Sequence, residues 1–415
     1  MALSYLTKRI KKLKIIRWRD LGDFFKILGA CPCGLVLRLF KRRLWLVSEM
    51  EHTARDNGYW FFKYMRETYP DRPVYYPIQF TSPDYGKVAA LGHVIRYGSF
   101  RHHIYLWAAE MHLSARTGRG LPAPFMCRQF QMLGLYPCKE VFLQHGVTVN
   151  LPPFLLKERN RIDLFLAATE KEAASICTGL HYDPEQVVIT GFARYDNLNE
   201  FEVDEKLILV MPTWRNWLFP PFGKTPEDVA EEVANSPYVK AWCGFLQDPR
   251  LEAFLEERDL RLLFFPHNQM QPFLSAFSGG SRRILIGDTA HYDVQEALKR
   301  AAFLVTDYSS IFFDFAYMGK PMCYYQFDYE EFRARHYPEG FFSYSEDGFG
   351  PVVTDPDSLL EELRRAEATG FRMDPVYAAR TENAFRYRDG QNCRRILEAV
   401  EEFRKKGGRK GEKRR

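Results

Sequence analysis

Histidines follow two apolar runs of the sequence, at positions where a buried strand would end. His145 comes after the run 140–143 and is followed by Gly146, and His267 comes after the run 261–265. An imidazole titrates near neutral pH, so each histidine could take up or release a proton in a reaction. For His145 alone, a hydrogen-bonded loop histidine is the simpler interpretation. If the two histidines share one cleft, one could act as a base while the other stabilises phosphate charge.

An arginine after a third apolar run indicates that the same cleft binds an anion. The run 207–211 is followed by Thr213, Arg215 and Asn216. A guanidinium directly beyond a buried strand suits bidentate contacts with phosphate oxygens. An ion pair between Arg215 and a carboxylate explains the pattern equally well, so both interpretations stay open.

A turn rich in hydroxyl groups lies beyond the run 303–306. Ser309 and Ser310 lie at the start of an amphipathic helix predicted over 310–318. We expect one of them to be its N-cap, with free backbone N–H groups beside it. An anion would suit that position, although capping alone explains part of the pattern. The polar residues that gather at this turn are Thr306, Asp307, Ser309, Ser310 and Asp314.

These side chains need parallel strands to position them, and the sequence predicts two sets. Short apolar runs alternate with helix-length segments from residue 44 onward, which indicates an α/β protein with two doubly wound, Rossmann-like domains facing a cleft. Ligands of such sheets bind beyond the carboxyl ends of the strands. The expected strands are 44–47, 74–78, 88–95, 104–107, 140–143, 164–167, 187–189, 207–211, 261–265, 283–286, 303–306, 321–325 and 352–353. The expected helices include 56–68, 170–178, 225–247, 294–301, 310–318 and 358–369.

Composition and charge divide the chain into four predicted parts. It has 415 residues, of which 46% are hydrophobic, and this excludes disordered and fibrous chains. The net charge of +5 is uneven, because residues 1–45 carry twelve Lys and Arg against two Asp and Glu, and residues 404–415 carry eight against one. We expect a basic segment 1–43, an N-terminal domain 44–198, a C-terminal domain 199–403 and a basic disordered tail 404–415.

The basic N-terminal segment has the pattern of a helix that lies on an anionic membrane surface. Bulky apolar residues alternate with Lys and Arg there, whereas the apolar stretch 24–40 is interrupted by Lys26, Pro32 and Arg38 and is too short to span a bilayer. A solvated helix and a nucleic-acid contact are the alternatives, and we favour the membrane surface. The expected location is therefore the inner face of the cell membrane, reached from the cytoplasm, with no nucleic-acid partner.

The cysteines and the absence of common motifs narrow the chemistry further. Eight cysteines occur with no C-x-x-C pair, which favours core thiols in a reducing compartment over a metal site. The sequence has no G-x-x-x-x-G-K-[ST] phosphate loop, no G-x-S-x-G elbow and no H-E-x-x-H helix. Kinase, hydrolase and zinc-protease functions are therefore disfavoured.

In order and spacing, these segments resemble the CDP-glycerol glycerophosphotransferases, which build teichoic-acid and related polymers. The resemblance covers about residues 44–391 and has two departures, at 147–150 and at Ala193, on the side where the acceptor would bind. The segments that carry it are Gln144-His145-Gly146, Thr190-Gly191-Phe192-Ala193-Arg194-Tyr195-Asp196, Pro212-Thr213-Trp214-Arg215, Pro266-His267, and Thr306-Asp307-Tyr308-Ser309-Ser310 with Asp314.

The resemblance implies a GT-B-like fold and a reaction in which an acceptor hydroxyl attacks CDP-glycerol and CMP leaves. The implied acceptor is a polyprenyl-diphosphate-linked glycan or a glycerol-phosphate chain. The implied catalytic residues are His145, His267 and Arg215. The implied donor-binding residues are Thr213, Arg215, Asn216, His267, Thr306, Asp307, Ser309, Ser310 and Asp314, and the residues on the acceptor side are Gln144, Gly146, Arg194 and Asp196.

Two other functions fit part of the pattern. A GT-B glycosyltransferase would move a sugar from a nucleotide donor and leave a nucleoside diphosphate instead of CMP. A non-catalytic protein whose basic ends bind anionic surfaces would show salt-sensitive binding without turnover. We expect no metal or other cofactor, while a role for a divalent ion, the choice between primer and polymer synthesis, CDP-ribitol as donor and the oligomeric state stay open.

Overall fold

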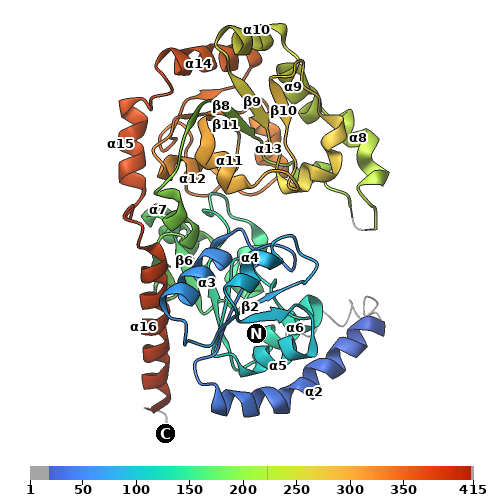
Figure 1. Cartoon of the computed structure of the whole chain (residues 1–415), viewed down its shortest axis with the longest axis vertical. Coiled ribbons are helices and arrows are strands. Elements are labelled where there is room, and N and C mark those ends of the chain that lie inside the picture. The colour runs from blue at the N-terminus through green and yellow to red at the C-terminus, as the bar shows by residue number, and fades with distance from the viewer. Residues whose placement is uncertain (1–17, 222, 413–415) are drawn as a thin grey trace.

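The computed structural model has two lobes, each built around its own parallel sheet, and it describes residues 18–221 and 223–412 (Figure 1). Helices cover both faces of each sheet, so the strands are buried on both sides and are rich in apolar residues. The predicted fold class, two doubly wound α/β domains, is confirmed.

The first lobe contains a seven-stranded sheet in the order β3-β2-β1-β4-β5-β6-β7, with every pair of neighbours parallel. Its strands are β1 (Trp45–Ser48), β2 (Val74–Ile78), β3 (Val94–Arg96), β4 (Met111–Ser114), β5 (Lys139–Phe142), β6 (Leu164–Ala167) and β7 (Val187–Ile189). Its helices are α2 (Trp18–Phe40), α3 (Asn57–Thr68), α4 (Tyr85–Ala90), α5 (Phe100–Ala108), α6 (Pro124–Met132) and α7 (Glu170–Gly179), followed by the 3-10 helix η5 (Ala193–Leu198).

The second lobe contains a six-stranded parallel sheet in the order β10-β9-β8-β11-β12-β13. Its strands are β8 (Asp204–Met211), β9 (Arg261–Phe264), β10 (Ile284–Ile286), β11 (Ala301–Thr306), β12 (Met322–Tyr325) and β13 (Val352–Val353). Its helices are α8 (Ala230–Ala234), α9 (Pro237–Leu246), α10 (Pro249–Glu257), α11 (Val294–Arg300), α12 (Phe312–Tyr317), α13 (Tyr329–Arg335), α14 (Pro356–Ala368) and α15 (Pro375–Ala384).

Three predicted elements differ from the structure. The segment 88–95 contains the end of α4 and the start of β3, and the segment 104–107 belongs to α5. The apolar side chains of α5 pack against α2, and Ser99 caps the helix by accepting a hydrogen bond from the His102 backbone N–H. The predicted helix 225–247 is interrupted before Pro237, which begins α9 with Ser236 as its N-cap.

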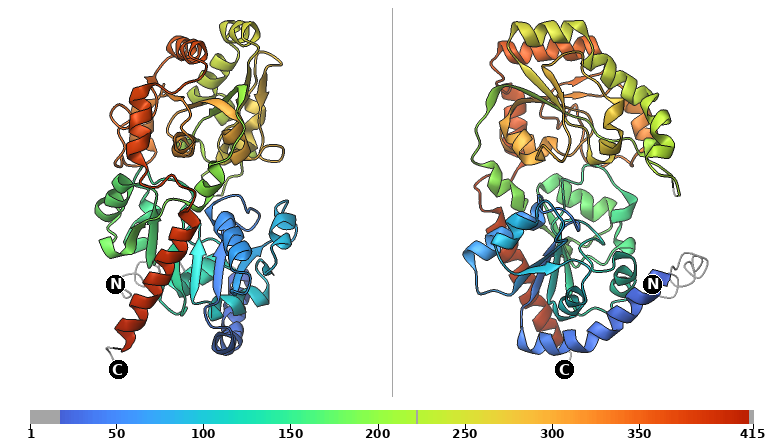
Figure 2. Two further views of the ribbon diagram at one scale, coloured as in Figure 1. Left: turned by 60° about the vertical axis from the view of Figure 1, so that its left-hand side comes forward. Right: turned by 45° about the vertical axis from the view of Figure 1, so that its right-hand side comes forward.

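The C-terminal helix α16 (Asn392–Glu412) returns to the first lobe after the second lobe is complete, and Figure 2 shows it along one side of that lobe. Its apolar side chains Cys393, Ile396, Leu397 and Val400 belong to the core of the first lobe. The helix thus differs from the prediction in two ways: its apolar side chains pack in the first lobe and not in the C-terminal domain, and residues 404–412 continue the helix. We keep a boundary near residues 198–199 as a proposal for the place where the chain first passes between the lobes.

A single hydrophobic cluster crosses from one lobe to the other. Val147, Val149 and Tyr195 of the first lobe pack in the same cluster as Phe312 and Tyr317 of the second. The backbone also joins the lobes, because the Leu151 N–H donates to the Pro338 carbonyl over 3.1 Å. The loops that follow the strands of the two sheets therefore face each other across the interface.

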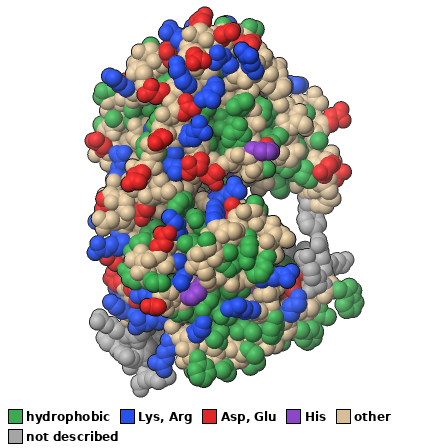
Figure 3. All heavy atoms as spheres, viewed as in Figure 1, with side chains coloured by type: hydrophobic (Ala, Val, Ile, Leu, Met, Phe, Trp, Pro, Cys, Tyr) green, Lys and Arg blue, Asp and Glu red, His purple; other side chains and the backbone are tan. Residues whose placement is uncertain are grey.

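Helix α2 presents a long apolar face to solvent at the edge of the first lobe. Its other face packs on α5, and Gly34 allows the close approach, because a Cβ there would lie 2.3 Å from the Trp107 Cβ. Hydrophobic side chains gather along the lower edge of Figure 3, where Figure 1 has α2. The exposed apolar residues of the helix are Trp18, Leu21, Phe25, Leu28, Leu35, Val36, Leu39 and Phe40.

No helix within residues 18–412, apart from the undescribed position 222, is both long and apolar enough to cross a bilayer. The predicted membrane-surface segment also includes residues 1–17, which lie outside the described residues. What the structure describes of that segment is α2 and the short stretch that leads into β1.

Candidate active site

His145 lies beyond the carboxyl end of β5, on a loop that hydrogen bonds of the preceding residue, Gln144, hold in place. Gln144 has a left-handed backbone, with φ of 60°, and this turns the chain sharply after the strand. The Gln144 amide donates to the Leu166 carbonyl at 2.5 Å and to Glu172 at 3.0 Å, and it accepts from the Thr148 hydroxyl at 2.6 Å. Because these contacts bury Gln144, the next side chain, His145, is directed outward and is exposed.

His267 occupies the matching position at the carboxyl end of β9. Its Nδ1 accepts a hydrogen bond from the Gln269 backbone N–H at 3.2 Å, so the ring proton lies on Nε2. The ring is half-buried and lies parallel to that of Trp214, with 6.3 Å between centroids. His267 is therefore a fixed donor, with Nε2–H as the group available to a ligand.

Burial and nearby cations hold both imidazoles in their neutral form. Burial and the charge of Arg116 lower the pKa of His267 to about 4. The pKa of His145 lies well below 6.5. Although the side chain is exposed, the protein around the ring disfavours its charged form, and the cationic Arg116 and Arg194 act in the same direction. The positive charge that His267 would carry lowers the pKa of His145 as well, so the two rings are close enough to interact. At neutral pH His145 can accept a proton.

The His145 loop meets the loop after β11 where Gly146 approaches the second lobe. A Cβ at Gly146 would lie only 2.6 Å from the Ser310 Oγ, so glycine permits this close contact. Ser309 and Ser310 are both half-buried. Figure 3 shows the surface hollowed between the lobes, with Lys and Arg side chains at the edge of the hollow.

The serines do not cap the helix that follows them. Helix α12 begins at Phe312, its N-cap residue is Ile311, and no side chain accepts a hydrogen bond from its first turn. The prediction that Ser309 or Ser310 is the N-cap is thus corrected, and the helix is too short to offer an anion site by itself. The nearby Thr306 is buried and donates its hydroxyl proton to the Met211 carbonyl at 2.7 Å, so it connects two strands.

Arg215 is enclosed within the second lobe and does not face the hollow. Its Nε and Nη2 contact Asp328 at 2.7 and 2.9 Å, and its Nη1 lies 2.9 Å from Asp307. The rings of Tyr238 and Tyr308 lie 4.7 and 5.1 Å from the guanidinium carbon, and the side chain is 0% exposed. In this arrangement Arg215 binds two carboxylates, which is the alternative left open above, and it cannot also reach a donor phosphate.

Asp307 is likewise part of the internal frame. Its carboxylate accepts from the Thr213 backbone N–H at 2.7 Å and from that of Tyr308 at 2.6 Å. Thr213 is buried, and within the described residues its hydroxyl has no hydrogen-bond partner. Asn216 is exposed at the start of the next turn. Of the residues predicted beyond β8, Asn216 alone has an exposed side chain.

On the predicted acceptor side, the guanidinium of Arg194 and the carboxylate of Asp196 form ion pairs and hydrogen bonds with other residues of the protein. Arg194 contacts Asp314 through Nε and Nη2 at 2.9 and 2.8 Å, and contacts Asp56 through Nη1 at 2.9 Å. Asp196 accepts hydrogen bonds of 2.8 Å from the backbone N–H groups of Asn392 and Cys393. Arg194 therefore joins the two lobes, and Asp196 holds the start of α16.

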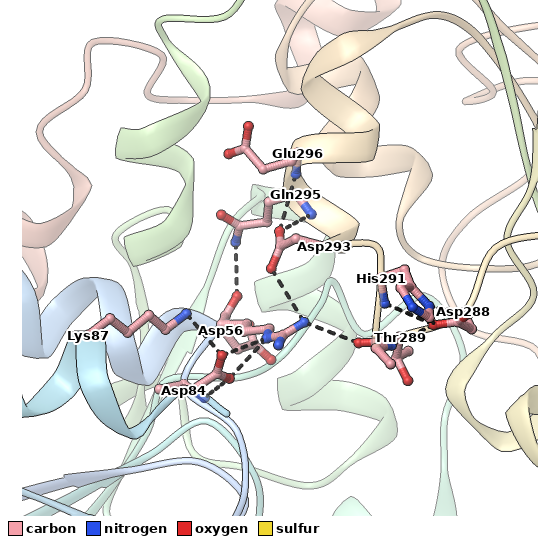
Figure 4. Close-up of polar contacts among 12 residues, drawn as sticks. Asp56, Asp84, Lys87, Asp288, Thr289, His291, Asp293, Gln295 and Glu296 are labelled. Carbon is pink, nitrogen blue, oxygen red and sulfur yellow. Dashed lines mark hydrogen bonds and ion pairs between the residues drawn. The ribbon is translucent and has the colours of Figure 1, made fainter. Parts of the chain in front are cut away.

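A second ion-pair bridge lies nearer the surface, and Figure 4 shows it. Asp84 from the first lobe and Asp293 from the second point toward one guanidinium, that of Arg55, at 2.9 and 3.8 Å. The same guanidinium donates to the Thr289 carbonyl at 3.5 Å, and the Gln295 amide donates to the Arg55 carbonyl at 3.2 Å. Two arginine bridges thus fix the lobes relative to each other.

Two residues near the histidines escaped the sequence analysis. His336 follows α13 and accepts a hydrogen bond from the Asn216 backbone N–H at 3.2 Å. Its ring lies 5.0 Å from that of Trp214, and burial and the cationic Arg215 lower its pKa to about 3. Arg116 follows β4, a strand that the analysis did not predict. His336 could not be recognised from the sequence as a strand-end residue, because it follows the helix α13 and not a strand.

The residues predicted for the site thus fall into two groups. The first group is open to solvent at least in part or touches such a residue: His145 and Asn216 are exposed, His267, Ser309 and Ser310 are half-buried, and Gly146 lies against Ser310. The buried group that shapes the surrounding loops is Gln144, Arg194, Thr213, Arg215, Thr306, Asp307 and Asp314, with Asp196 at the start of α16. In the described part of the chain no three His, Cys, Asp or Glu side chains gather where they could hold a metal ion.

Comparison with known protein families gives one match that spans most of the chain. Residues 32–402 match the model described as CDP-Glycerol:Poly(glycerophosphate) glycerophosphotransferase. The chain is 30% identical over 378 residues to the "Minor teichoic acid biosynthesis protein GgaB" of Bacillus subtilis (strain 168), which covers 89% of this chain and 41% of that protein. It is 23% identical over 373 residues to the "Teichoic acid poly(glycerol phosphate) polymerase" of the same strain, covering 82% and 46%. The chain therefore spans less than half the length of these relatives.

Solved structures share the fold at low sequence identity. The wall teichoic acid polymerase TagF superposes with a TM-score of 0.62 and 15% identity, covering 94% of this chain and 99% of that one. A variant of TagF was also solved after a 15 minute soak with CDPG, with a TM-score of 0.63, 16% identity and coverage of 94% and 99%. A putative UDP-N-acetylglucosamine 2-epimerase from Listeria monocytogenes gives a TM-score of 0.53 at 15% identity, covering 88% and 97%. These likenesses support the GT-B-like architecture.

Proposed function

Because the chain belongs to the CDP-glycerol:poly(glycerophosphate) glycerophosphotransferase family, we propose that it transfers glycerol phosphate from CDP-glycerol to a membrane-lipid-linked acceptor hydroxyl. CMP is the other product. The proposal is carried by a pair of strand-end histidines: His145 follows β5 of the first sheet, His267 follows β9 of the second, and positive charge on His267 would lower the pKa of His145. In this proposal each lobe contributes one imidazole to the reaction.

In the first part of the proposed reaction, His145 accepts the proton of the acceptor hydroxyl. Its neutral ring is exposed, and it has no hydrogen-bond partner among the described residues, so a ring nitrogen is free for this role. The hydroxyl oxygen attacks the phosphorus that bears glycerol, and an oxygen–phosphorus bond forms. The bond from that phosphorus to the bridging oxygen breaks, and CMP leaves with the bonding electrons.

In the second part, fixed donors stabilise the charge that grows on the phosphate oxygens. His267 offers Nε2–H, and Ser309 and Ser310 offer hydroxyl groups at the opposite side of the same junction. Such transfer depends mainly on positioning and electrostatic stabilisation. Arg215 and Asp307 act indirectly in this proposal, because they hold the loops after β8 and β11 in place.

We also propose that α2 lies on an anionic membrane and brings the hollow close to lipid-linked acceptors on the cytoplasmic face. Eight apolar side chains of α2 are exposed at spacings of one to seven residues, for example Phe25 at 63% and Leu39 at 70% exposure. Arg42 and Arg43 are exposed at the end of the helix, where they can contact anionic head groups. An apolar face of this kind is costly in water and is typical of helices that lie in a membrane interface.

The deciding experiment for the reaction is to identify the released nucleotide. Purified protein is incubated with CDP-glycerol and either a lipid-linked or a glycerol-phosphate-primed acceptor, and nucleotides are separated by chromatography. Acceptor-dependent CMP is the expected result. Product length then distinguishes addition of one unit from polymerisation, and a parallel reaction with CDP-ribitol tests the donor. CDP or UDP released from nucleotide sugars, with no CMP from CDP-glycerol, would contradict the proposal and favour a glycosyltransferase.

The membrane proposal has its own test with a matched control. The double variant Phe25→Ser/Leu39→Ser removes two exposed side chains of α2, whereas Val376→Ser removes an exposed apolar side chain on α15. Cosedimentation with vesicles containing phosphatidylglycerol should fall in the double variant and stay unchanged in the control. Equal cosedimentation of all three proteins would contradict a role for α2.

A further inference from the structure

The loop after β4 lies at the place where a ligand of the first sheet is expected. Strand β1 pairs with β2 on one side and with β4 on the other, so the chain reverses its direction of winding between β1 and β4. Ligands of open parallel sheets bind at such a switch point, beyond the carboxyl ends of the strands. The loop that follows β4 there has the sequence Ala115-Arg116-Thr117-Gly118-Arg119-Gly120.

The loop is held in a defined shape by contacts below it. The Ser114 hydroxyl accepts from the Arg116 backbone N–H at 3.2 Å and donates to the Arg116 carbonyl at 2.7 Å. Gly120 has φ of 71°, and a Cβ there would lie 1.9 Å from the Ser48 Oγ. Ser48 in turn lies 2.9 Å from the Nε2 of His112, so the loop rests on a buried polar pair. The backbone of Arg116 is thus held by contacts within the protein.

Arg116 differs from the other arginines of the interface because it has no counter-charge in contact. It is half-buried, yet among residues 18–221 and 223–412 no carboxylate oxygen lies within 4.0 Å of its guanidinium, and that group makes no hydrogen bond. Arg55, Arg194 and Arg215 each contact two carboxylates. A half-buried cation without such a partner loses part of its hydration and is not compensated by a protein anion, so a bound anion would stabilise it.

The backbone brings Arg116 beside His145, and electrostatics brings it near His267. In the parallel pair of β4 and β5, Ser114 is opposite Phe142, so Arg116 and His145 follow neighbouring strands by two and three residues. The charge of Arg116 lowers the pKa of both histidines. Burial raises the pKa of Asp56, and the charges of Arg194 and Arg116 oppose this rise. The strand register and these electrostatic influences together place Arg116 on the side of the first sheet that carries His145.

We propose that Arg116 binds a phosphate group of the substrate between the two histidine loops, a role that rests on the proposed transfer reaction. A guanidinium matches phosphate oxygens through paired N–H donors, and its charge balances the anion. The phosphate belongs either to the diphosphate of the donor or to the phosphate of the acceptor. Both present the same oxygen chemistry, so the binding experiment separates them.

The first test measures binding without turnover. Calorimetric titrations use inorganic pyrophosphate, CDP-glycerol and glycerol 3-phosphate, each with wild type, Arg116→Gln and the control Arg119→Gln. Arg119 is exposed on the same loop, and its charge bears on Tyr97, away from the histidines. We expect Arg116→Gln to weaken pyrophosphate binding at least about tenfold and Arg119→Gln to change it little. Equal affinity of the wild type and Arg116→Gln for all three probes would overturn the proposal.

The other two probes assign the phosphate. Weaker binding of CDP-glycerol alone places the donor diphosphate on Arg116, and weaker binding of glycerol 3-phosphate alone places the acceptor phosphate there. Because neither titration needs catalysis, these outcomes stand even if the transfer reaction itself is not observed.

A second test reports on the position of the charge. Nuclear magnetic resonance titration of the imidazoles should show the pKa values of His145 and His267 rising in Arg116→Gln, since a cation that disfavours the protonated rings is removed. Arg119→Gln should leave both values unchanged. Unaltered histidine titrations in Arg116→Gln, in a protein that melts like the wild type, would contradict the placement of Arg116 at the hollow.

Discussion

Arg215 and Arg116 both follow strands that border a switch point, and their surroundings are opposite. Arg215 follows β8 and Arg116 follows β4, and each strand borders the point where its sheet reverses its winding, on opposite sides of that point. Arg215 is 0% exposed and contacts Asp307 and Asp328, whereas Arg116 is half-buried with no carboxylate in contact among the described residues. One guanidinium stabilises the fold, and the other is free to bind a substrate.

The comparison shows that position at a switch point does not by itself identify a ligand-binding residue. A buried ion pair must satisfy its charges internally, and removal of one partner leaves the other charge uncompensated. The groups in contact with a guanidinium therefore decide its role. By this criterion the proposed site takes its cationic group, Arg116, from the first lobe and its neutral donors, His267, Ser309 and Ser310, from the second.

The largest expected effect is on stability, and it separates the two arginines directly. Arg215→Leu should lower the free energy of unfolding by about 3–5 kcal/mol, because Asp307 and Asp328 lose their cation. Arg116→Leu should change it by about 0.5 kcal/mol or less, since no ion pair is lost. Urea denaturation of both variants provides the measurement. Similar midpoints for the two proteins would mean that the two arginines contribute equally to stability.

The next effect concerns the rate and tests which sheet holds the base. His145→Ala should lower kcat by about 100-fold or more, because no other group at the first sheet takes the hydroxyl proton. Donor affinity should change little. His267→Ala should instead raise the KM for CDP-glycerol together with a smaller loss in kcat. Steady-state kinetics of CMP release measure both, and a reversed pattern would exchange the roles of the two sheets.

The pH dependence follows from the pKa shifts of the histidines. Both values lie below 6.5, and that of His267 is about 4, so the neutral rings persist as the pH falls through 6.5. The acidic limb of kcat/KM for CDP-glycerol should therefore lie below pH 6.5. In Arg116→Gln the limb should move to higher pH, because the cation that lowers both pKa values is absent. A wild-type midpoint at or above 6.5 would contradict the lowered pKa values, and an unmoved limb in Arg116→Gln would show that Arg116 does not act on these rings.

The smallest effect tests how closely Gly146 of the first lobe approaches Ser310 of the second. Gly146→Ala places a Cβ 2.6 Å from the Ser310 Oγ, and the serine must move aside. We expect a loss of about 1 kcal/mol in stability, which Ser310→Gly should restore in the double variant. Gly86→Ala is the control, because no atom lies within 4 Å of a Cβ built at that position. Thermal melting of the three variants is sufficient. A Gly146→Ala protein as stable as Gly86→Ala would mean that the contact is loose.

The sequence predicted the fold class and most strands because buried parallel strands are nearly continuous apolar runs. Strands β2, β6 and β7 coincide with the predicted ranges 74–78, 164–167 and 187–189. The exception that mattered is β4, whose sequence Met111-His112-Leu113-Ser114 alternates apolar with polar residues. His112 and Ser114 are buried because Ser48, Glu140 and the following loop satisfy them. Only the tertiary structure provides those partners.

The same reason explains what the sequence could predict of the site. The strand-end positions of His145 and His267 were visible, because each follows a clear apolar run. The burial of Arg194 and Arg215 was not visible, since Asp314 and Asp328 lie about a hundred residues away along the chain. Arg116 was overlooked together with β4, because a residue can be recognised as a strand-end residue only when its strand is recognised.

The return of α16 to the first lobe has a mechanical consequence. The chain crosses between the lobes twice, once after η5 and once before α16, and the two crossings touch where Asp196 holds Asn392. A Cβ on Gly191 would lie 2.1 Å from the Asn392 Oδ1, so the crossings are packed side by side. Two connections at one point act as a single hinge. Any opening of the lobes must therefore be a rotation about this corner, and the Arg55 and Arg194 bridges set how far it can go.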